Sequence, residues 1–362
     1  MRGFHREIFA IREINAISAL AAEKRRAGVD LLDLTESNPT RAGIVYPAGF
    51  LGALADERSL LYEPEPFGLQ AARERIAAEY DAPFDNVILT ASTSEAYSWI
   101  FKLLCDPGDE VLVPRPSYPL FEHLAAMESV VVKHYRLFYD HGWFIDFHML
   151  ERAMNERTRA IVLVNPNNPT GHYIRRHEVE ELAAVCDRRG VSILSDEVFA
   201  DYAIDPDRES ARTLRGVADF ALSGLSKVVG LPQMKLAWMI TKRPMPEMEI
   251  IADTYLSVGT PAQVALPALL ELRETVQLQI LARVRANLER TPRHLRVEAG
   301  WYAVVPVTDE DDTALRLLRE HNVLVQPGYF YDFEKQGYLV VSLLTRPEVF
   351  EAGMDRFRGV CG

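Results

Sequence analysis

The feature that most constrains this chain is a series of short apolar runs separated by helical segments. The clearest run, Ala-Ile-Val-Leu-Val at 160–164, has no polar residue, which is typical of a strand covered on both faces. Strands that alternate with helices form a mostly parallel sheet between helices, so we predict an α/β fold with a mostly parallel seven-stranded sheet. The predicted strands are 87–90, 110–113, 130–134, 160–164, 192–194, 220–222 and 237–241.

The order of the segments also predicts how the chain is divided. A chain of 362 residues has room for two domains. We expect residues 1–40 to form an arm, with a helix at 8–24, that joins the smaller domain. Residues 41–245 are expected to form the large domain. Residues 246–362 open with a long helical region and then alternate strands with helices, which predicts a smaller α/β domain.

Composition excludes several kinds of partner. The formal net charge is −12, so the chain lacks the basic field that binding to nucleic acid or an anionic membrane requires. No apolar run is long enough to span a bilayer, and the first residues lack the apolar core of a signal peptide. The three cysteines, at 105, 186 and 361, match no zinc pattern and no disulfide framework. We therefore expect a cytoplasmic protein.

The common catalytic fingerprints are missing from the sequence. It contains no glycine-rich nucleotide loop, no His-Glu-x-x-His and no Gly-x-Ser-x-Gly, and its nine histidines form no ligand cluster. Nucleotide-dependent and metal-dependent chemistry therefore have little support, and we expect no metal.

Polar strings follow two of the predicted strands. Asn-Pro-Asn-Asn-Pro-Thr-Gly at 165–171 follows the strand at 160–164, and Ser-Asp-Glu-Val-Phe at 195–199 follows the strand at 192–194. Open α/β sheets bind ligands at the carboxyl ends of their strands, so both strings are candidates for a site. Taken alone, the first is also explained as a polar loop, and Asp196 as a helix cap or a surface acid.

Two further strings complete the pattern. Ser-Gly-Leu-Ser-Lys at 223–227 presents Lys227 among small residues, where its amine can form a Schiff base with an aldehyde cofactor, although most lysines are surface charges. Thr-Ala-Ser-Thr-Ser-Glu-Ala at 90–96 is a strand-to-helix turn. Its N–H groups can hold a phosphate, or it can simply be a helix cap with Glu95 in the first turn.

Together these strings supply an amine, a carboxylate and a phosphate-binding turn, which are the groups that pyridoxal 5′-phosphate (PLP) needs. On these strings, and on Asp-Pro-Gly-Asp-Glu-Val-Leu-Val-Pro at 106–114 with Pro-Ser-Tyr-Pro at 116–119, the chain resembles the class I/II aminotransferases of PLP fold type I. The resemblance covers about residues 31–357. It implies PLP as the cofactor, an amino donor and a 2-oxo acid as substrates, and a homodimer.

The resemblance also assigns roles to residues around the cofactor ring. Lys227 would form the Schiff base and then move the proton during transfer. Asp196 would keep the pyridine nitrogen protonated. Asn168 would hydrogen-bond the phenolic oxygen of the ring, with a cis peptide bond to Pro169. Tyr118 would stack on the ring.

Other roles concern the phosphate and the substrate. The resemblance implies that Tyr62 reaches the phosphate of the neighbouring subunit, and that Asn38 lies in the segment that touches the substrate carboxylate. The phosphate itself would be held by backbone groups of Ser92, Thr93 and Ser94.

Three positions depart from the commonest pattern of the family. Phe199 stands where a tyrosine usually donates a hydrogen bond to the phenolic oxygen of PLP. Lys235, where arginine is most frequent, keeps the positive charge for the phosphate but not the two-pronged hydrogen bond. Val340 stands where the arginine that binds the substrate α-carboxylate is usual, and either Arg346 or Arg41 is a candidate to replace it.

Three functions remain open on the sequence alone. The first is amino-group transfer between an amino acid and a 2-oxo acid. The second keeps the cofactor but changes the outcome to β-elimination, racemisation or a synthase reaction, because the sequence does not reveal which bond at the substrate carbon is broken. The third is a PLP-binding sensor or scaffold with little turnover, against which the retained Lys227, Asp196 and Asn168 argue.

Phe199→Tyr tests the first departure. A tyrosine there would donate a hydrogen bond to the phenolate of PLP and should lower the pKa of the Schiff-base nitrogen relative to the wild type. The measurement is a pH titration of the visible absorption spectrum of both proteins. If the pKa does not fall, the role assigned to position 199 is wrong.

Overall fold

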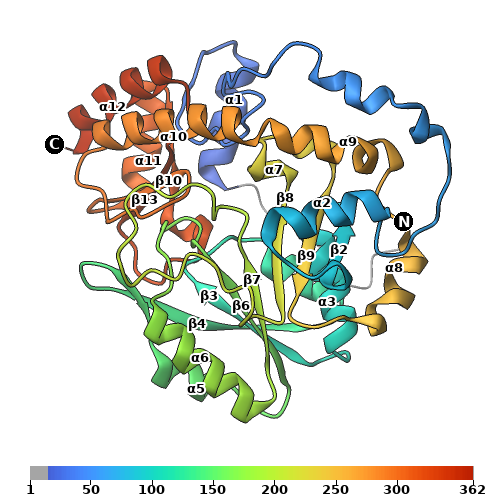
Figure 1. Cartoon of the computed structure of the whole chain (residues 1–362). Coiled ribbons are helices and arrows are strands. Elements are labelled where there is room, and N and C mark those ends of the chain that lie inside the picture. Colours follow the sequence, from blue (N-terminus) through green and yellow to red (C-terminus); the bar gives the residue numbers. More distant parts are fainter. Residues whose placement is uncertain (1–14, 362) are drawn as a thin grey trace, which may run out of the picture.

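The structure, a computed structural model, describes residues 15–361, and its centre is one eight-stranded sheet (Figure 1). In spatial order the strands are β2 (Val87–Thr90), β9 (Ala237–Thr241), β8 (Phe220–Gly224), β7 (Ser192–Asp196), β6 (Thr158–Val164), β3 (Glu110–Arg115), β4 (Val131–Tyr139) and β5 (Trp143–Ile145). The five strands β8, β7, β6, β3 and β4 run parallel to their neighbours in this row. β9 is antiparallel to β2 and β8, and β5 is antiparallel to β4.

The predicted α/β fold with a mostly parallel sheet is confirmed, but the sheet has eight strands rather than seven. The additional strand, β5, has only three residues and pairs with the end of β4. β4 is also longer than predicted because its residues alternate between more and less exposed positions instead of forming one apolar run. Both features belong to the exposed edge of the sheet, where apolar runs are a poor guide.

Both faces of the sheet are covered, as the apolar runs predict. On β6, Ala160, Val162 and Val164 pack into one hydrophobic cluster, whereas Ile161 and Leu163 pack into another, because successive side chains of a strand point to opposite faces. Helices α3 (Thr93–Leu104), α4 (Phe121–Met127) and α8 (Glu249–Tyr255) cover the first face. The second is covered by α5 (Phe147–Ala153) and α6 (Arg176–Arg189), and at the β2–β9 edge by α2 (Gln70–Tyr80) and α9 (Thr260–Glu271).

The remaining elements form a second group, at the upper left of Figure 1. Here β10 (Tyr302–Pro306), β13 (Tyr338–Ser342) and β12 (Gln326–Pro327) make an antiparallel sheet, and β1 (Leu32–Asp33) pairs with β11 (Val323–Leu324). The helices of this group are α1 (Ala16–Arg26), α10 (Arg273–Arg290), α11 (Glu310–His321) and α12 (Pro347–Cys361). The early part of the chain thus packs against its end. The first part of the helix predicted at 8–24 lies outside the described residues.

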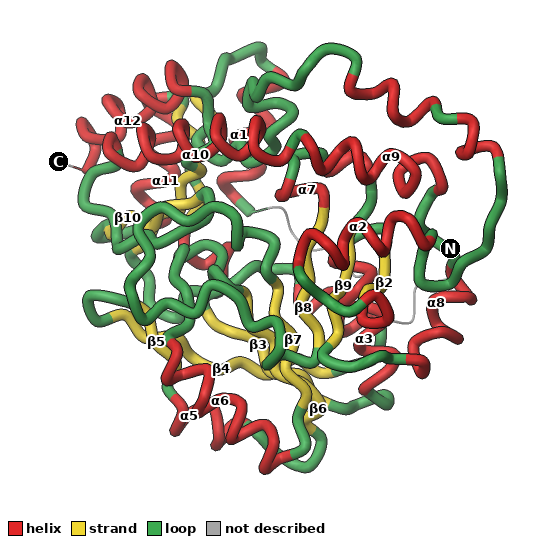
Figure 2. Tube along the Cα trace, in the orientation of Figure 1, coloured by secondary structure: helices red, strands yellow, loops and turns green. Residues whose placement is uncertain are grey.

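Figure 2 shows the strands gathered between the helices. Short helical segments connect these elements. One such segment, the helix α7 (Leu225–Val228), directly follows β8. The 3-10 helices are Phe50–Ala55, Glu57–Leu60, Phe84–Asn86, Pro232–Met234, Pro246–Met248 and Gly328–Tyr331.

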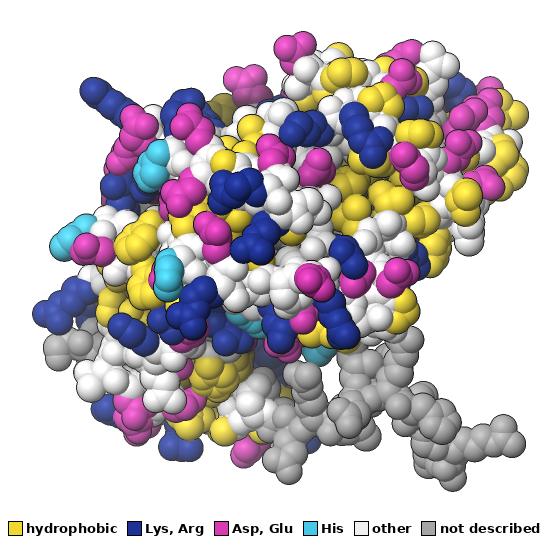
Figure 3. All heavy atoms as spheres, turned by 90° about the horizontal axis from the view of Figure 1, so that it is seen from below, with side chains coloured by type: hydrophobic (Ala, Val, Ile, Leu, Met, Phe, Trp, Pro, Cys, Tyr) yellow, Lys and Arg dark blue, Asp and Glu magenta, His cyan; other side chains and the backbone are white. Residues whose placement is uncertain are grey.

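The surface mixes acidic and basic side chains, as Figure 3 shows for one face. Among the described residues, no helix combines the length and the apolar composition needed to cross a bilayer. On the face shown in Figure 3, the acidic side chains are interspersed with basic ones.

Gly171, the last residue of the string at 165–171, joins the two groups of elements. Its φ is +71°, and a Cβ built there would lie 2.4 Å from the carbonyl oxygen of Ala299, whose N–H donates to Gly171 O at 2.8 Å. An alanine would therefore meet both backbone strain and a collision. Gly190, which ends α6 at φ +66°, has no atom within 4 Å of such a Cβ.

Gly171→Ala should consequently lower thermal stability much more than Gly190→Ala. The second substitution carries only the left-handed penalty, roughly 1–2 kcal/mol, whereas the first also displaces the backbone at residue 299. Differential scanning calorimetry of both variants measures this. Equal losses of Tm would show that the approach of residues 171 and 299 is not tight.

Candidate active site

The carboxyl ends of β6, β7 and β8 meet the turn between β2 and α3 around a cavity of about 300 Å³, here called the strand-end cavity. This is the edge at which open α/β sheets bind ligands. It brings together all four strings that the sequence singles out. Its lining residues are Ser37, Ala91, Ser92, Thr93, Ser94, Tyr118, Phe121, Val164, Asn168, Asp196, Val198, Phe199, Ser226, Lys227, Pro232, Lys235, Leu236 and Tyr302.

Lys227 lies in α7, directly after β8, with its amine buried in this cavity. Its Nζ is 5.1 Å from the ring centroid of Phe199 and 4.6 Å from that of Trp301. Burial lowers the pKa of Lys227 to about 8, and the negative charge of Asp196 opposes this shift. The backbone is fixed as well, since the Tyr202 hydroxyl donates to Lys227 O at 2.5 Å. The amine is therefore half deprotonated near pH 8, well below the pH at which an ordinary lysine loses its proton.

Asp196 ends β7 and is partly buried at the strand-end cavity. Burial raises the pKa of its carboxyl to about 6, although the Val198 N–H (3.2 Å) and the Tyr97 hydroxyl (3.1 Å) both donate to it. A carboxylate held in this way is stabilised further by any positive charge that enters the cavity. Asp196 is therefore neither a helix cap nor a surface acid.

The three asparagines of the string at 165–171 have different roles. Asn165 is structural, since its amide donates to Ala211 O and accepts from Ile174 N. Asn167 accepts from the Thr170 hydroxyl. Asn168 alone lines the cavity, and its buried Oδ1 has no hydrogen-bond partner among the described residues. The predicted cis bond between Asn168 and Pro169 is present.

The turn at 90–96 is a helix cap whose backbone also faces the cavity. The Ser92 hydroxyl oxygen accepts from Glu95 N at 3.1 Å, and Glu95 in turn accepts from Ala91 N at 2.6 Å. This capping leaves the first-turn N–H groups of Thr93 and Ser94 without intrahelical acceptors, at the positive end of α3. The helix cap is therefore present, and phosphate binding by the same turn stays a prediction.

The other predicted residues fall into two groups. Tyr118, 42% exposed, and Lys235, at φ +48°, line the strand-end cavity. Asn38 lines an adjoining cavity of about 670 Å³, here called the entrance cavity, which shares Lys227 with the first. Tyr62 is not brought to either cavity of its own chain: it is 77% exposed and lines a small separate pocket beside Trp99.

A ligand cannot reach Val340, the residue that stands where the carboxylate-binding arginine is expected. Val340 is fully buried in β13 and lines neither cavity. Of the two candidates to replace it, Arg346 donates to the backbone carbonyl of Arg41 at 3.2 Å and also lines neither. Arg41 lines the entrance cavity, and its closest carboxylate, on Glu36, is 3.5 Å away. The structure thus separates two arginines that the sequence left equivalent.

The structure adds residues to the site that the sequence analysis does not predict. Trp301 and Tyr302 come from the C-terminal group of elements, and burial raises the pKa of Tyr302 to about 12. Tyr97, the donor to Asp196, sits one turn into α3. For Tyr97 the period of the helix offers a signal, since it lies four residues after Thr93. For Trp301 and Tyr302 no local pattern points to the site.

The chain is also similar to proteins of a known family. Residues 51–353 match the family described as aminotransferase class I and II. The chain belongs to this family. Nicotianamine aminotransferase 1 of Oryza sativa subsp. japonica is 27% identical over 334 residues, covering 82% of this chain and 67% of that relative. An S-alkyl-thiohydroximate lyase of Arabidopsis thaliana is 24% identical over 331 residues, covering 81% of this chain and 71% of that relative.

Solved structures agree with the sequence matches. A Thermus thermophilus aspartate aminotransferase double mutant superposes with a TM-score of 0.86 at 26% identity, covering 99% of this chain and all of that one. Fold and family thus identify a PLP-dependent aminotransferase of fold type I, as the resemblance implied. The strand-end cavity fits PLP, because it offers a buried amine, a buried carboxyl, the side-chain amide of Asn168 as a donor, and N–H groups at a helix start that have no intrahelical acceptor.

The depressed pKa of Lys227 can be measured in cofactor-free protein. Labelling of its amine by trinitrobenzenesulfonate, followed by mass spectrometry of the peptide, should show a midpoint near pH 8, with the exposed Lys242 as internal reference. Asp196→Asn removes the charge that raises the pKa of Lys227, so the midpoint should move to lower pH. A midpoint that stays fixed or moves to higher pH would contradict the coupling of the two groups.

Proposed function

We propose that this chain transfers an amino group between an amino acid and a 2-oxo acid, with Lys227 as the residue that binds PLP covalently. The observation that carries the proposal is the buried amine of Lys227, with its lowered pKa, in the same cavity as the buried carboxyl of Asp196. When bound, PLP supplies an aldehyde that accepts amino groups and a ring that withdraws electrons.

The residues of the cavity would divide the remaining work. The amine of Lys227 would hold the cofactor and, once displaced by the substrate, would carry a proton at Nζ to and from the substrate carbon. Asp196 would place its negative charge beside the ring nitrogen and so keep it protonated. Asn168 would donate its side-chain N–H to the phenolic oxygen, and Tyr118 would cover the ring.

The phosphate end would lie at the start of α3. Backbone N–H groups of Ser92, Thr93 and Ser94 would hold it, with the charge of Lys235 nearby.

We further propose that Arg41 binds the carboxylate of the substrate. Its backbone is held from the C-terminal group, since Arg346 donates to Arg41 O and Arg283 donates to Ala42 O. Its side chain is 76% exposed, and among the described residues its one ion-pair partner is Glu36, at 3.5 Å. A fixed backbone with an exposed guanidinium at the entrance to Lys227 suits the capture of a carboxylate.

Assembly as a homodimer is part of the proposal, with Tyr62 reaching the phosphate site of the partner. The segment that carries Tyr62 is rich in exposed apolar side chains, a feature typical of interaction surfaces. They are Val45 (70%), Leu51 (52%), Leu60 (86%), Leu61 (59%) and Tyr62 (77%).

We also propose that the protein is cytoplasmic. The free thiols of Cys105 and Cys186 agree with the reducing conditions of a cytoplasm.

The function is tested by adding PLP and reducing with borohydride, which should modify Lys227 in the peptide map. Treatment of the unreduced protein with an amino donor alone should remove the PLP absorption and release one equivalent of 2-oxo acid, and a second oxo acid should restore it. Release of ammonia would instead indicate the elimination outcome, which a lyase among the relatives makes a necessary control.

Arg41→Gln should raise the KM for the oxo acid by about 10–100-fold with a much smaller change in kcat, because a charge-assisted hydrogen bond contributes roughly 1.5–3 kcal/mol. Arg26→Gln, a substitution of an exposed arginine that does not line the entrance cavity, is the matched control. Steady-state kinetics of both variants decide the matter. An unchanged KM in Arg41→Gln would refute this role.

A further inference from the structure

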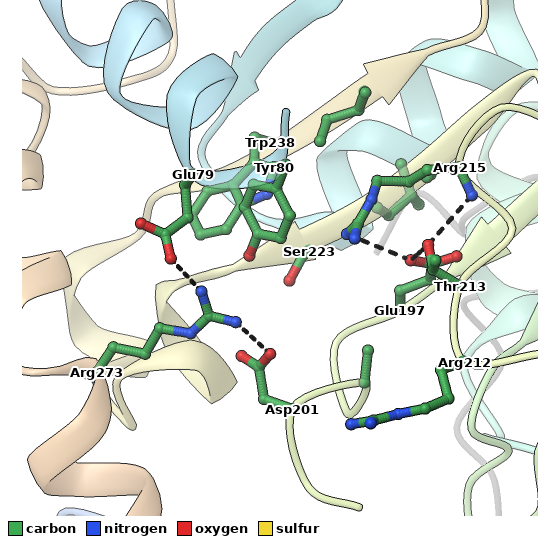
Figure 4. A pocket seen from close by; sticks show the side chains of 14 residues that line it. Glu79, Tyr80, Glu197, Asp201, Arg212, Thr213, Arg215, Ser223, Trp238 and Arg273 are labelled. Atoms are coloured by element: carbon green, nitrogen blue, oxygen red, sulfur yellow. Dashed lines mark hydrogen bonds and ion pairs between the residues drawn. The ribbon is translucent and has the colours of Figure 1, made fainter. Parts of the chain in front are cut away.

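A third cavity, here called the α2–α10 cavity, lies apart from the site described above (Figure 4). It has a volume of about 310 Å³ and shares no lining residue with the strand-end or entrance cavity. It is bounded by the end of α2, the start of α10, the strands β8 and β9, and the segments that follow β7. Its volume is within the range of cavities that bind small molecules.

The charges on the α10 side of this cavity are already paired. Arg273, at the start of α10, forms ion pairs with both Glu79 and Asp201, and Glu79 also pairs with Arg75 at 2.5 Å. Gln277 donates to Asp201 as well, at 2.7 Å. This side therefore has no excess charge to offer a ligand.

On the opposite side of the cavity, the carboxyl of Glu197 accepts hydrogen bonds from neutral donors. Glu197 is buried, and burial raises the pKa of its carboxyl. It accepts from the hydroxyls of Thr213 (2.7 Å) and Ser195 (3.0 Å) and from Leu214 N (2.6 Å). Arg215 approaches it only to 3.7 Å.

The two guanidinium groups on this side are incompletely compensated, because the ion pair between Arg215 and Glu197 is long. Arg212 has no ion-pair partner among residues 15–361 and lies beside the Tyr173 hydroxyl. In Figure 4 its side chain lies along the edge of the open centre of the cavity, below Glu197. Arg215, on the other side of that centre, rests on the ring of Tyr80 with its Cζ 4.7 Å from the centroid. With Glu197 as the one acid on this side, the two arginines leave one positive charge in excess.

We propose that the α2–α10 cavity binds a small organic acid, whose carboxylate pairs with Arg212 and Arg215. The volume exceeds what one carboxylate fills, and the walls beyond the two arginines include Ala200, Ala221 and Leu222, which suit a short carbon body. A carboxylate between two guanidinium groups gains charge-assisted hydrogen bonds that the present neighbours do not supply. The bound acid would connect the segment after β7 with β8.

Titration calorimetry at low salt tests this with succinate, benzoate and inorganic phosphate as probes, on the full chain. We expect at least one of the two acids to bind, and Arg212→Gln to weaken it by 10-fold or more. Arg208→Gln, which changes an exposed arginine outside the cavity, should leave the affinity unchanged. Arg41→Gln should also leave it unchanged, which separates this site from the proposed substrate site.

Four results would overturn the proposal: no binding of either acid, equal binding to Arg212→Gln and wild type, loss of binding in Arg41→Gln alone, or tighter binding of phosphate than of both acids. The side chain of Arg212 is exposed, so the variant should fold. A melting temperature equal to that of the wild type, measured without ligand, verifies this. Crystals soaked in the tighter acid should then show it between residues 212 and 215.

Discussion

The structure depends on keeping an amine and a carboxyl together in a cavity that favours the uncharged form of each. Burial lowers the pKa of Lys227 and raises that of Asp196, and their mutual attraction only partly restores the charges. A buried pair of this kind is costly unless hydrogen bonds or a ligand compensate it. Here Tyr97 and Val198 donate hydrogen bonds to the acid, whereas the amine lies against the rings of Phe199 and Trp301 and makes no hydrogen bond among the described residues. That asymmetry leaves the amine reactive.

The scaffold makes this arrangement possible by joining two parts of the chain. Parallel strands deliver Asp196 and Lys227 to one edge of the sheet, which is a property of the topology and not of either residue. The C-terminal group then closes the cavity with Trp301 and Tyr302, and the contact between Gly171 and Ala299 fixes its approach. Reactivity at Lys227 therefore relies on packing between segments far apart in the sequence.

Much of the fold could be predicted because the central strands are continuous apolar runs, and the site because its polar strings follow those strands. What could not be predicted lacks a local signal. β5 is only three residues long, and Trp301 reaches the amine from a segment 74 residues further along the chain. The sequence does not distinguish Arg41 from Arg346 as the arginine that binds the substrate carboxylate. Only the fold shows that Arg346 donates a hydrogen bond to the backbone of Arg41. Which of the three asparagines faces the cavity is also a matter of turn geometry.

Asp196 and Glu197 show how one strand end can serve two cavities. They are adjacent, and successive side chains at the end of a strand point to opposite faces, so one lines the strand-end cavity and the other the α2–α10 cavity. Burial raises the pKa of both carboxyls, but the compensation differs: Asp196 faces a single amine, whereas Glu197 is saturated by hydroxyl and backbone donors. The carboxyl of Asp196 would therefore suit a cationic ring, as proposed, whereas Glu197 compensates the neighbouring guanidinium groups only in part and leaves them suited to the proposed anion. Because the side chains of Asp196 and Glu197 point to opposite faces, these two adjacent residues line one cavity suited to a cation and another suited to an anion.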